Sequence, residues 1–235
     1  MTCKLCQNIS PLQNSHILPE FVYTQLYDDK HRMQVLSSHE QNPRPYEQKG
    51  LRERLLCRNC ETKLSRYERY ASTAFDGKET ETPVDGVIIV NGVDYKQFKL
   101  FLLSILWRAS ISSLEFFDKV CLGPHEDKIR EMILTNDPGP SDRYGIVPFA
   151  LIDDHKIQSD LIIQPSRTKL YGHVGYRFIF GGFMWVYLVS SHSAPKEMKP
   201  LFVMEDNSLC IIKGDFRACG IIAEFAKKLK KMGRI

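Results

Sequence analysis

The sequence predicts an α+β fold in two parts: an N-terminal part over residues 1–80 and an α+β domain over residues 84–235 with an antiparallel sheet. Three observations support this prediction. The first part carries two Cys-x-x-Cys pairs and few apolar runs, the second carries short apolar segments separated by turn residues, and both contain segments with helical periodicity. With 235 residues, 43% of them hydrophobic, the chain can bury a sizeable core.

Short elements are expected around the cysteines of the first part. Pro19 favours a helix start, because proline suits the first turn of a helix. The polar segment before Pro83 contains Gly77 and predicts a linker. The expected elements are a helix over 18–29, strands over 32–38 and 51–57, a helix over 61–75 and the linker over 76–83.

The sequence of the second part predicts two helices, a sheet and a closing helix. Asn91-Gly92 lies between two apolar runs and predicts a hairpin within 87–95, because both residues accept a positive φ. Gly181-Gly182 and Asp206-Asn207 predict turns between strands. The expected helices cover 95–114, 124–136 and 216–235, and the expected strands cover 146–152, 160–164, 174–180, 183–190, 200–204 and 209–213.

The two Cys-x-x-Cys pairs predict one structural zinc site with the ligands Cys3, Cys6, Cys57 and Cys60. Such turns present two thiolates to one ion, and zinc takes four such ligands in a tetrahedron. The second pair lies where a strand ends and a helix begins, and this order of elements is that of a treble clef. A redox role is the alternative, but no thioredoxin-like βαβ pattern surrounds either pair. The isolated cysteines Cys121, Cys210 and Cys219 are expected to pack as small apolar residues.

The composition favours a cytoplasmic protein without a membrane span. No run of eighteen apolar residues exists, and the first ten residues lack the apolar region of a signal peptide. The net charge is +4, and residues 44–69 alone carry eight basic and four acidic side chains. The basic excess around the second cysteine pair suits phosphate contacts, or it forms a solvated face with internal ion pairs.

The segments "CKLC", "SHILP" and "LLCRNCETK" occur in this order over residues 1–75, and together they resemble the zinc-bearing HNH endonucleases, which have a treble-clef, ββα-metal fold. The resemblance implies that His16 is the general base and that Glu61 binds a catalytic divalent cation, Mg²⁺ or Mn²⁺. Ser15 stands where the family has a metal-binding aspartate. Asn42 is a candidate for the family's loop asparagine, and His39 for a second site histidine.

The chemistry of these residue types fits that assignment. A histidine can accept a proton near neutral pH, and a carboxylate is a hard ligand for Mg²⁺ or Mn²⁺. Each residue also has a structural interpretation. His16 could hold the backbone through a hydrogen bond, and Glu61 could be an acid that interacts with the dipole of its helix. Glu68, two turns further on, is expected to pair with an arginine or a backbone amide.

The sequence therefore predicts a metal-dependent, HNH-like endonuclease that cleaves nucleic acid, DNA rather than RNA, and the resemblance suggests a bacterial or phage setting such as antiviral genome defence. The C-terminal domain would recognise the target, form a homo-oligomer, bind a protein partner or regulate the enzyme. The alternative is a non-catalytic zinc treble clef that binds nucleic acid or a protein. A third hypothesis is a sensor or adaptor whose active part is the C-terminal domain.

Overall fold

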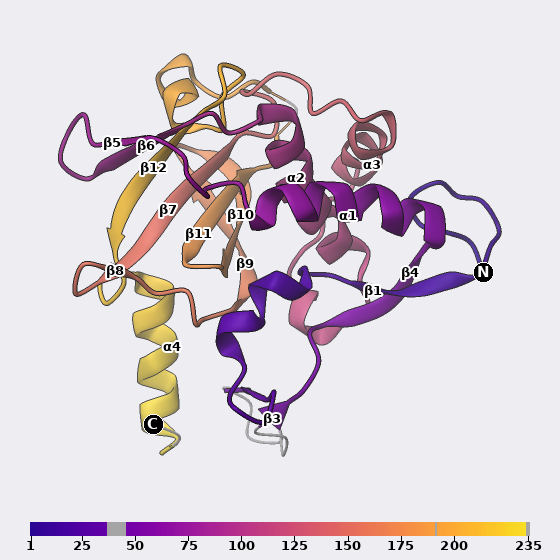
Figure 1. The fold of residues 1–235 in the computed structure, drawn as a ribbon, viewed down its shortest axis with the longest axis horizontal. Helices are drawn as coiled ribbons and strands as arrows, with labels where there is room; N and C mark the ends of the chain where they lie inside the picture. Colours follow the sequence, from indigo (N-terminus) through magenta and orange to yellow (C-terminus); the bar gives the residue numbers. More distant parts are fainter. Residues whose placement is uncertain (37–45, 191, 234–235) are drawn as a thin grey trace.

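The structure is a computed structural model that describes residues 1–36, 46–190 and 192–233 (Figure 1). It is a mixed α/β structure whose strands pair mainly antiparallel. The helices are α1 (Arg58–Ser72), α2 (Tyr95–Ile111), α3 (His125–Thr135) and α4 (Gly220–Lys231), with 3₁₀ turns η1 (Glu20–Val22), η2 (Thr24–Leu26), η3 (Glu115–Phe117) and η4 (Lys196–Leu201). The strands are β1 (Leu12–His16), β2 (Met33–Gln34), β3 (Tyr46–Glu47), β4 (Arg52–Cys57), β5 (Thr80–Glu81), β6 (Val87–Asn91), β7 (Ile146–Asp153), β8 (Lys156–Ile157), β9 (Ile163–Leu170), β10 (His173–Phe180), β11 (Phe183–Leu188) and β12 (Ser208–Asp215).

The large sheet has the strand order β5-β6-β12-β7-β11-β10-β9, and β8 pairs with β7. Its neighbouring strands run antiparallel except β12 and β7, which are parallel. The expected antiparallel sheet is therefore confirmed in its main part and corrected at this pair. A parallel pair arises because the chain reaches β12 only after β11 and inserts it between β6 and β7.

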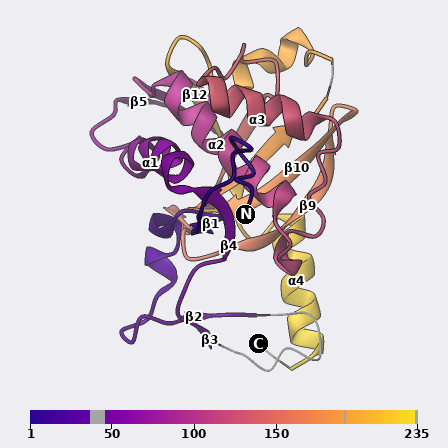
Figure 2. The same cartoon turned by 90° about the vertical axis from the view of Figure 1, so that its right-hand side faces the viewer.

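Helix α2 forms the centre of the molecule. Thirteen of its seventeen residues are buried, which agrees with a helix that is apolar on nearly every side. In Figure 2, α2 lies between α1 and the strands β9 and β10. One hydrophobic cluster extends from Cys3 to Ile211 and includes side chains of both predicted parts. The boundary between residues 1–80 and 84–235 thus remains a prediction, because the two parts share a core.

Polar contacts also join α1 and the first loop to α3. The Lys63 ammonium donates to the carbonyl of Leu134 at 2.5 Å, and the Tyr67 hydroxyl donates to the Asn136 side chain at 2.6 Å. Arg130 of α3 donates to the carbonyl of Leu5 at 3.0 Å. The cysteine-bearing segments are therefore held directly against the rest of the molecule.

Several predicted elements are confirmed with shifted ends. The predicted strand over 51–57 is β4, and the predicted helices over 61–75, 95–114 and 124–136 are α1, α2 and α3. The turns at Gly181-Gly182 and Asp206-Asn207 are present. The strand expected over 160–164 begins only at Ile163 and continues to Leu170.

Other predicted elements are wrong, and each error has a local cause. The segment 18–29 forms the two 3₁₀ turns η1 and η2 instead of one helix, and the backbone becomes extended at Tyr27. The segment 200–204 is not a strand, since η4 covers its start and Pro200 lacks the N–H that a sheet needs. The predicted linker over 76–83 contains β5, which pairs with β6.

The hairpin expected at Asn91-Gly92 is also wrong. Gly92 adopts a φ of 76°, but it leads β6 into α2 rather than into a second strand. Asp94 caps α2 by accepting a hydrogen bond from the Gln97 N–H at 2.9 Å. No described helix combines the length and the apolar character that crossing a bilayer requires.

Candidate functional site

The four predicted cysteine ligands form one cluster at the start of α1. The Sγ atoms of Cys3, Cys6, Cys57 and Cys60 all lie within 4.8 Å of one another, and those of Cys6 and Cys57 are 3.8 Å apart. A tetrahedral zinc ion with Zn–S bonds of about 2.3 Å separates its sulfur ligands by about 3.8 Å. The cluster could therefore hold a metal ion such as zinc.

The local structure favours a thiolate at Cys57. β1 pairs with β4, which places Cys57 at the end of a strand opposite Leu12, and the Cys57 N–H donates to the Cys3 sulfur at 3.3 Å. Burial opposes ionisation of Cys57, but hydrogen bonds from the backbone at Cys60 and from the neighbouring thiols outweigh it and lower the pKa of Cys57 to about 7. Burial raises the pKa of Cys60. A bound cation would stabilise all four thiolates.

Ser15 and Glu61 meet between β1 and α1. Ser15 is buried in β1, and Glu61 lies in the first turn of α1, directly after the last cysteine ligand. Burial raises the pKa of Glu61, whereas the Ser15 hydroxyl and the positive charge of Arg108 oppose this shift. One buried carboxylate oxygen of Glu61 has no hydrogen-bond partner among the described residues.

The His16 imidazole lies in a different polar group. Its Nε2 is 2.8 Å from Oε2 of Glu20, which also accepts a hydrogen bond from Arg52 at 3.3 Å, and Oε1 of Glu20 accepts one from Tyr27 at 3.1 Å. The exposed fractions of the His16 and Glu20 side chains are 24% and 43%, so solvent reaches this pair. Burial and the charge of Arg52 lower the pKa of His16, although Glu20 opposes the shift. These contacts therefore favour the neutral form of His16.

Arg108 connects the group around Glu61 to the group around His16, and the sequence analysis did not predict this role. This fully buried side chain of α2 donates to the carbonyl of His16 at 2.7 Å and forms an ion pair with Glu68 at 2.7 Å. It also donates to the Ser104 carbonyl at 3.2 Å. The signal in the sequence was a cation within the apolar second half of the helix, after two lysines in the first half, since such a charge must find partners when the helix is buried.

The structure thus brings Ser15, Glu61, Glu68 and Arg108 together, and it attaches His16 to them through its carbonyl. The negative charge of Glu68, like that of Glu20, partly opposes the lowering of the His16 pKa, and among the described residues no hydrogen bond or ion pair joins the His16 imidazole to Glu61. Within residues 1–36, 46–190 and 192–233, the cysteine cluster is the only recorded group of three or more metal ligands. His39 and Asn42 lie outside the described residues.

The geometry alone assigns no family to this site. No known family model matches the chain, and neither a curated protein nor a solved structure matches it. The functional argument therefore rests on the residues of this chain.

Proposed function

We propose that this chain is a zinc-stabilised, HNH-like endonuclease that hydrolyses phosphodiester bonds of nucleic acid, DNA in preference to RNA, with His16 as the general base. The observation that supports the proposal is the contact of 2.8 Å between His16 and Glu20, in a position that solvent reaches. A neutral histidine oriented by a carboxylate is the usual arrangement of a general base. The four-cysteine cluster and the order of β1, β4 and α1 support a treble-clef unit around it.

The roles of the residues follow from this contact. When Glu20 accepts the hydrogen bond from Nε2–H of His16, Nδ1 keeps the lone pair that removes a proton from water. The oxygen of that water attacks phosphorus, and the bond to the leaving oxygen breaks. The resulting imidazolium is stabilised by Glu20, and the buried Arg108 holds the backbone of His16 in place.

Glu61 is the proposed ligand of a catalytic cation. Its unpartnered, buried carboxylate oxygen is a hard ligand, and Mg²⁺ in nucleases is often held by one or two carboxylates together with water and phosphate oxygens. Glu61 would therefore hold Mg²⁺ or Mn²⁺, and a cation bound there would supply positive charge that stabilises the phosphate and the leaving oxygen. Glu68 is less available, because Arg108 neutralises it.

A cleavage assay tests the proposal. Plasmid and single-stranded DNA and RNA would be incubated with the wild type and with His16→Ala, Glu20→Gln and Glu61→Gln in Mg²⁺ or Mn²⁺. Loss of a general base lowers the rate by roughly 10²- to 10⁴-fold, so His16→Ala should show this decrease. His173→Ala, on β10 of the large sheet, is the matched control and should cut at the wild-type rate. Equal cutting by wild type and His16→Ala would contradict the proposal.

One observation favours the non-catalytic zinc module as a second candidate. Arg108 places a buried guanidinium beside Glu61 and Glu68, and it could replace a divalent cation in balancing these carboxylates. Ser15 supports this candidate, because a neutral hydroxyl is a poor cation ligand. Nucleic-acid or protein binding without any Mg²⁺- or Mn²⁺-dependent cutting would favour this function.

A further inference from the structure

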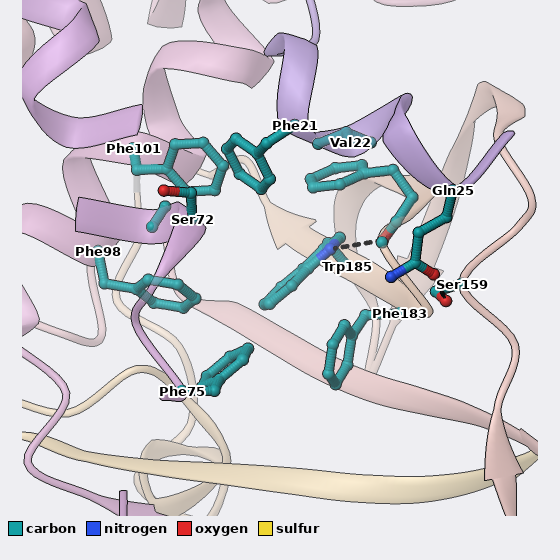
Figure 3. A pocket seen from close by; sticks show the side chains of 13 residues that line it. Phe21, Val22, Gln25, Ser72, Phe75, Phe98, Phe101, Ser159, Phe183 and Trp185 are labelled. Carbon is teal, nitrogen blue, oxygen red and sulfur yellow. Dashed lines mark hydrogen bonds between the residues drawn. The ribbon is translucent and has the colours of Figure 1, made fainter. Parts of the chain in front are cut away.

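A pocket of about 250 Å³ opens between the N-terminal turns, the end of α1 and the β10–β11 turn (Figure 3). The N-terminal turns contribute Phe21 and Gln25, and Phe75 follows α1. Phe98 comes from α2, and Trp185 comes from β11. The pocket therefore lies where segments far apart in the sequence meet.

Aromatic rings form most of its wall. Phe98 meets Trp185 edge to face with ring centroids 5.9 Å apart, and Phe75 lies 5.8 Å from Phe183. The Trp185 ring also stacks on Phe180 at 5.8 Å. These separations are favourable for aromatic pairs, so the rings hold one another in place. The wall is thus a preformed surface that suits a flat ring.

The volume limits the size of an occupant. An apolar cavity of roughly 150 Å³ stays dry and accepts benzene. A pocket of about 250 Å³ can therefore take a single or a fused pair of aromatic rings. An occupant would also form dispersion contacts with the wall atoms, which have no neighbour on the side of the empty space.

The mouth of the pocket is polar. Gln25 and Ser159 lie next to each other at one side, as Figure 3 shows. The Ser159 hydroxyl donates to the Gln25 amide oxygen. Ser72, the last residue of α1, is exposed at another side. The wall thus offers apolar ring faces, and the rim offers hydrogen-bonding groups. A nucleobase matches both, because its face is apolar and its edge carries hydrogen-bond donors and acceptors.

The pocket lies beside the proposed site. Phe21 follows Glu20 directly, and Ser72 lies one turn beyond Glu68 on α1, about 6 Å along the helix axis. A nucleic-acid strand whose phosphate lies near His16 could therefore place a neighbouring base into the pocket. Arg52, whose side chain is 30% exposed, pairs with Glu20, the residue before Phe21.

We propose that this aromatic pocket binds one unstacked nucleobase of a single-stranded nucleic-acid segment. The proposal deepens the proposed function, on which it rests, by naming single-stranded segments as the substrate class. Stacking on aromatic side chains contributes to the binding of every base, so the pocket holds a strand without selecting its sequence. An aromatic pocket suits an unstacked base because a paired base exposes only its edges to a protein.

Two strands of about ten nucleotides test the pocket, a labelled oligodeoxythymidine and a fully abasic strand of the same length and charge. Fluorescence anisotropy measures both affinities at one salt concentration. Wild type should bind the thymidine strand roughly five- to 100-fold more tightly than the abasic strand. Trp185 emission should be quenched only by the thymidine strand.

Two variants locate this difference. Ser72→Phe places a ring at the mouth of the pocket. It should lower the affinity for the thymidine strand to that for the abasic strand, and it should leave the affinity for the abasic strand unchanged. Thr62→Phe adds the same ring at an exposed position near the start of α1 and should behave as wild type. Phe183→Leu keeps an apolar wall but removes one ring, and it should lower only the affinity for the thymidine strand. Thermal unfolding confirms that each variant is folded.

The outcomes separate this proposal from the proposed function. Equal affinities for the two strands, no binding of either strand, or a base-dependent difference that survives Ser72→Phe would overturn the pocket proposal. Cleavage that depends on His16 would still support the nuclease in those cases. Base-dependent binding that Ser72→Phe removes, together with no cleavage, would support the pocket and contradict the nuclease.

Discussion

Arg108 of α2 and Glu68 of α1 form an ion pair of 2.7 Å that joins the two predicted parts of the chain. The guanidinium is buried, and the carboxylate is 22% exposed. The same guanidinium also holds the carbonyl of His16. One side chain from the second part therefore fixes both the helix and the strand on which the proposed site is built.

Replacing Arg108 should destabilise the fold strongly. Arg108→Met leaves Glu68 and the His16 carbonyl without their partner, and breaking a buried ion pair in this way costs about 3–5 kcal/mol. Urea denaturation measures the free energy of unfolding. The double variant with Glu68→Gln should recover much of the loss, because the unpaired charge is removed.

Arg217 provides the control for this experiment. It pairs with Asp153 at 2.9 Å, but its side chain is 77% exposed. Arg217→Met should therefore change the free energy of unfolding by less than about 1 kcal/mol. If Arg108→Met lowers the free energy of unfolding as little as Arg217→Met does, the ion pair of Arg108 with Glu68 does not stabilise the fold.

Purified protein should contain about one zinc ion per chain, bound by the four cysteines. Cys57→Ser or a strong chelator should remove the ion and unfold the N-terminal segments, because metal binding in small zinc units contributes on the order of 10 kcal/mol to folding. Elemental analysis and circular dichroism measure the two effects. Cys121→Ser, at an exposed cysteine, should change neither. Full helicity in the metal-free protein would contradict the assignment.

Lys99 should make stability depend on pH in the alkaline range. Burial lowers its pKa to about 7, although its ammonium donates to Tyr95 and to the carbonyls of Pro140 and Arg143. Its unfolded pKa is about 10.4, so between these values the unfolded chain binds more protons than the native chain. The free energy of unfolding should therefore rise with pH from about 7 to 10, by at most about 1.4 kcal/mol per pH unit from this group.

Lys99→Met isolates this contribution. In the variant, the free energy of unfolding should no longer rise between pH 7 and 10, because methionine does not titrate. Denaturation at several pH values measures the slope. Equal slopes in the two proteins would mean that the three acceptors keep the Lys99 pKa near its ordinary value.

The rate of cleavage should fall at acidic pH. Burial lowers the pKa of His16 below the ordinary histidine value of about 6.5. The imidazole should therefore stay neutral until the pH falls below that value, and the cleavage rate should decrease only at lower pH. Glu20 raises the pKa of His16, so Glu20→Gln should move the acid limb to lower pH while reducing the maximal rate. A profile of kcat against pH measures both changes. If Glu20→Gln leaves the acid limb unchanged, Glu20 does not affect the pKa of the group that limits the rate, and the proposed role of the pair is contradicted.

The sequence predicts best the features that depend on local spacing. The Cys-x-x-Cys turns and the strand before α1 were recognisable because each involves a few consecutive residues, and the cysteine cluster is confirmed. Arg108 was missed because Glu68 and His16, the partners that tie it to the first part of the chain, lie 40 and 92 positions away. The pocket beside Trp185 was missed for the same reason, since its walls come from five separate segments.

Errors in the fold have a similar origin. Asn91-Gly92 has strong hairpin chemistry, but its strand pairs with β5 and β12, and Asp94 starts a helix immediately afterwards. The parallel pairing of β12 with β7 has no local signal, because it depends on where the chain returns to the sheet. The contact of His16 with Glu20 was missed although only four positions separate them, because His16 ends β1 and Glu20 begins η1, so no helical periodicity relates the two residues.

The insertion of β12 between β6 and β7 has a consequence for how the chain acquires its structure. During synthesis β6 and β7 both emerge well before β12, and each then has an unpaired edge where β12 will bind. Such edges recruit strands from other chains, and distant pairings form slowly. A nascent chain that stalls before Ser208 would therefore be prone to aggregate, and chaperone protection would matter most in that interval.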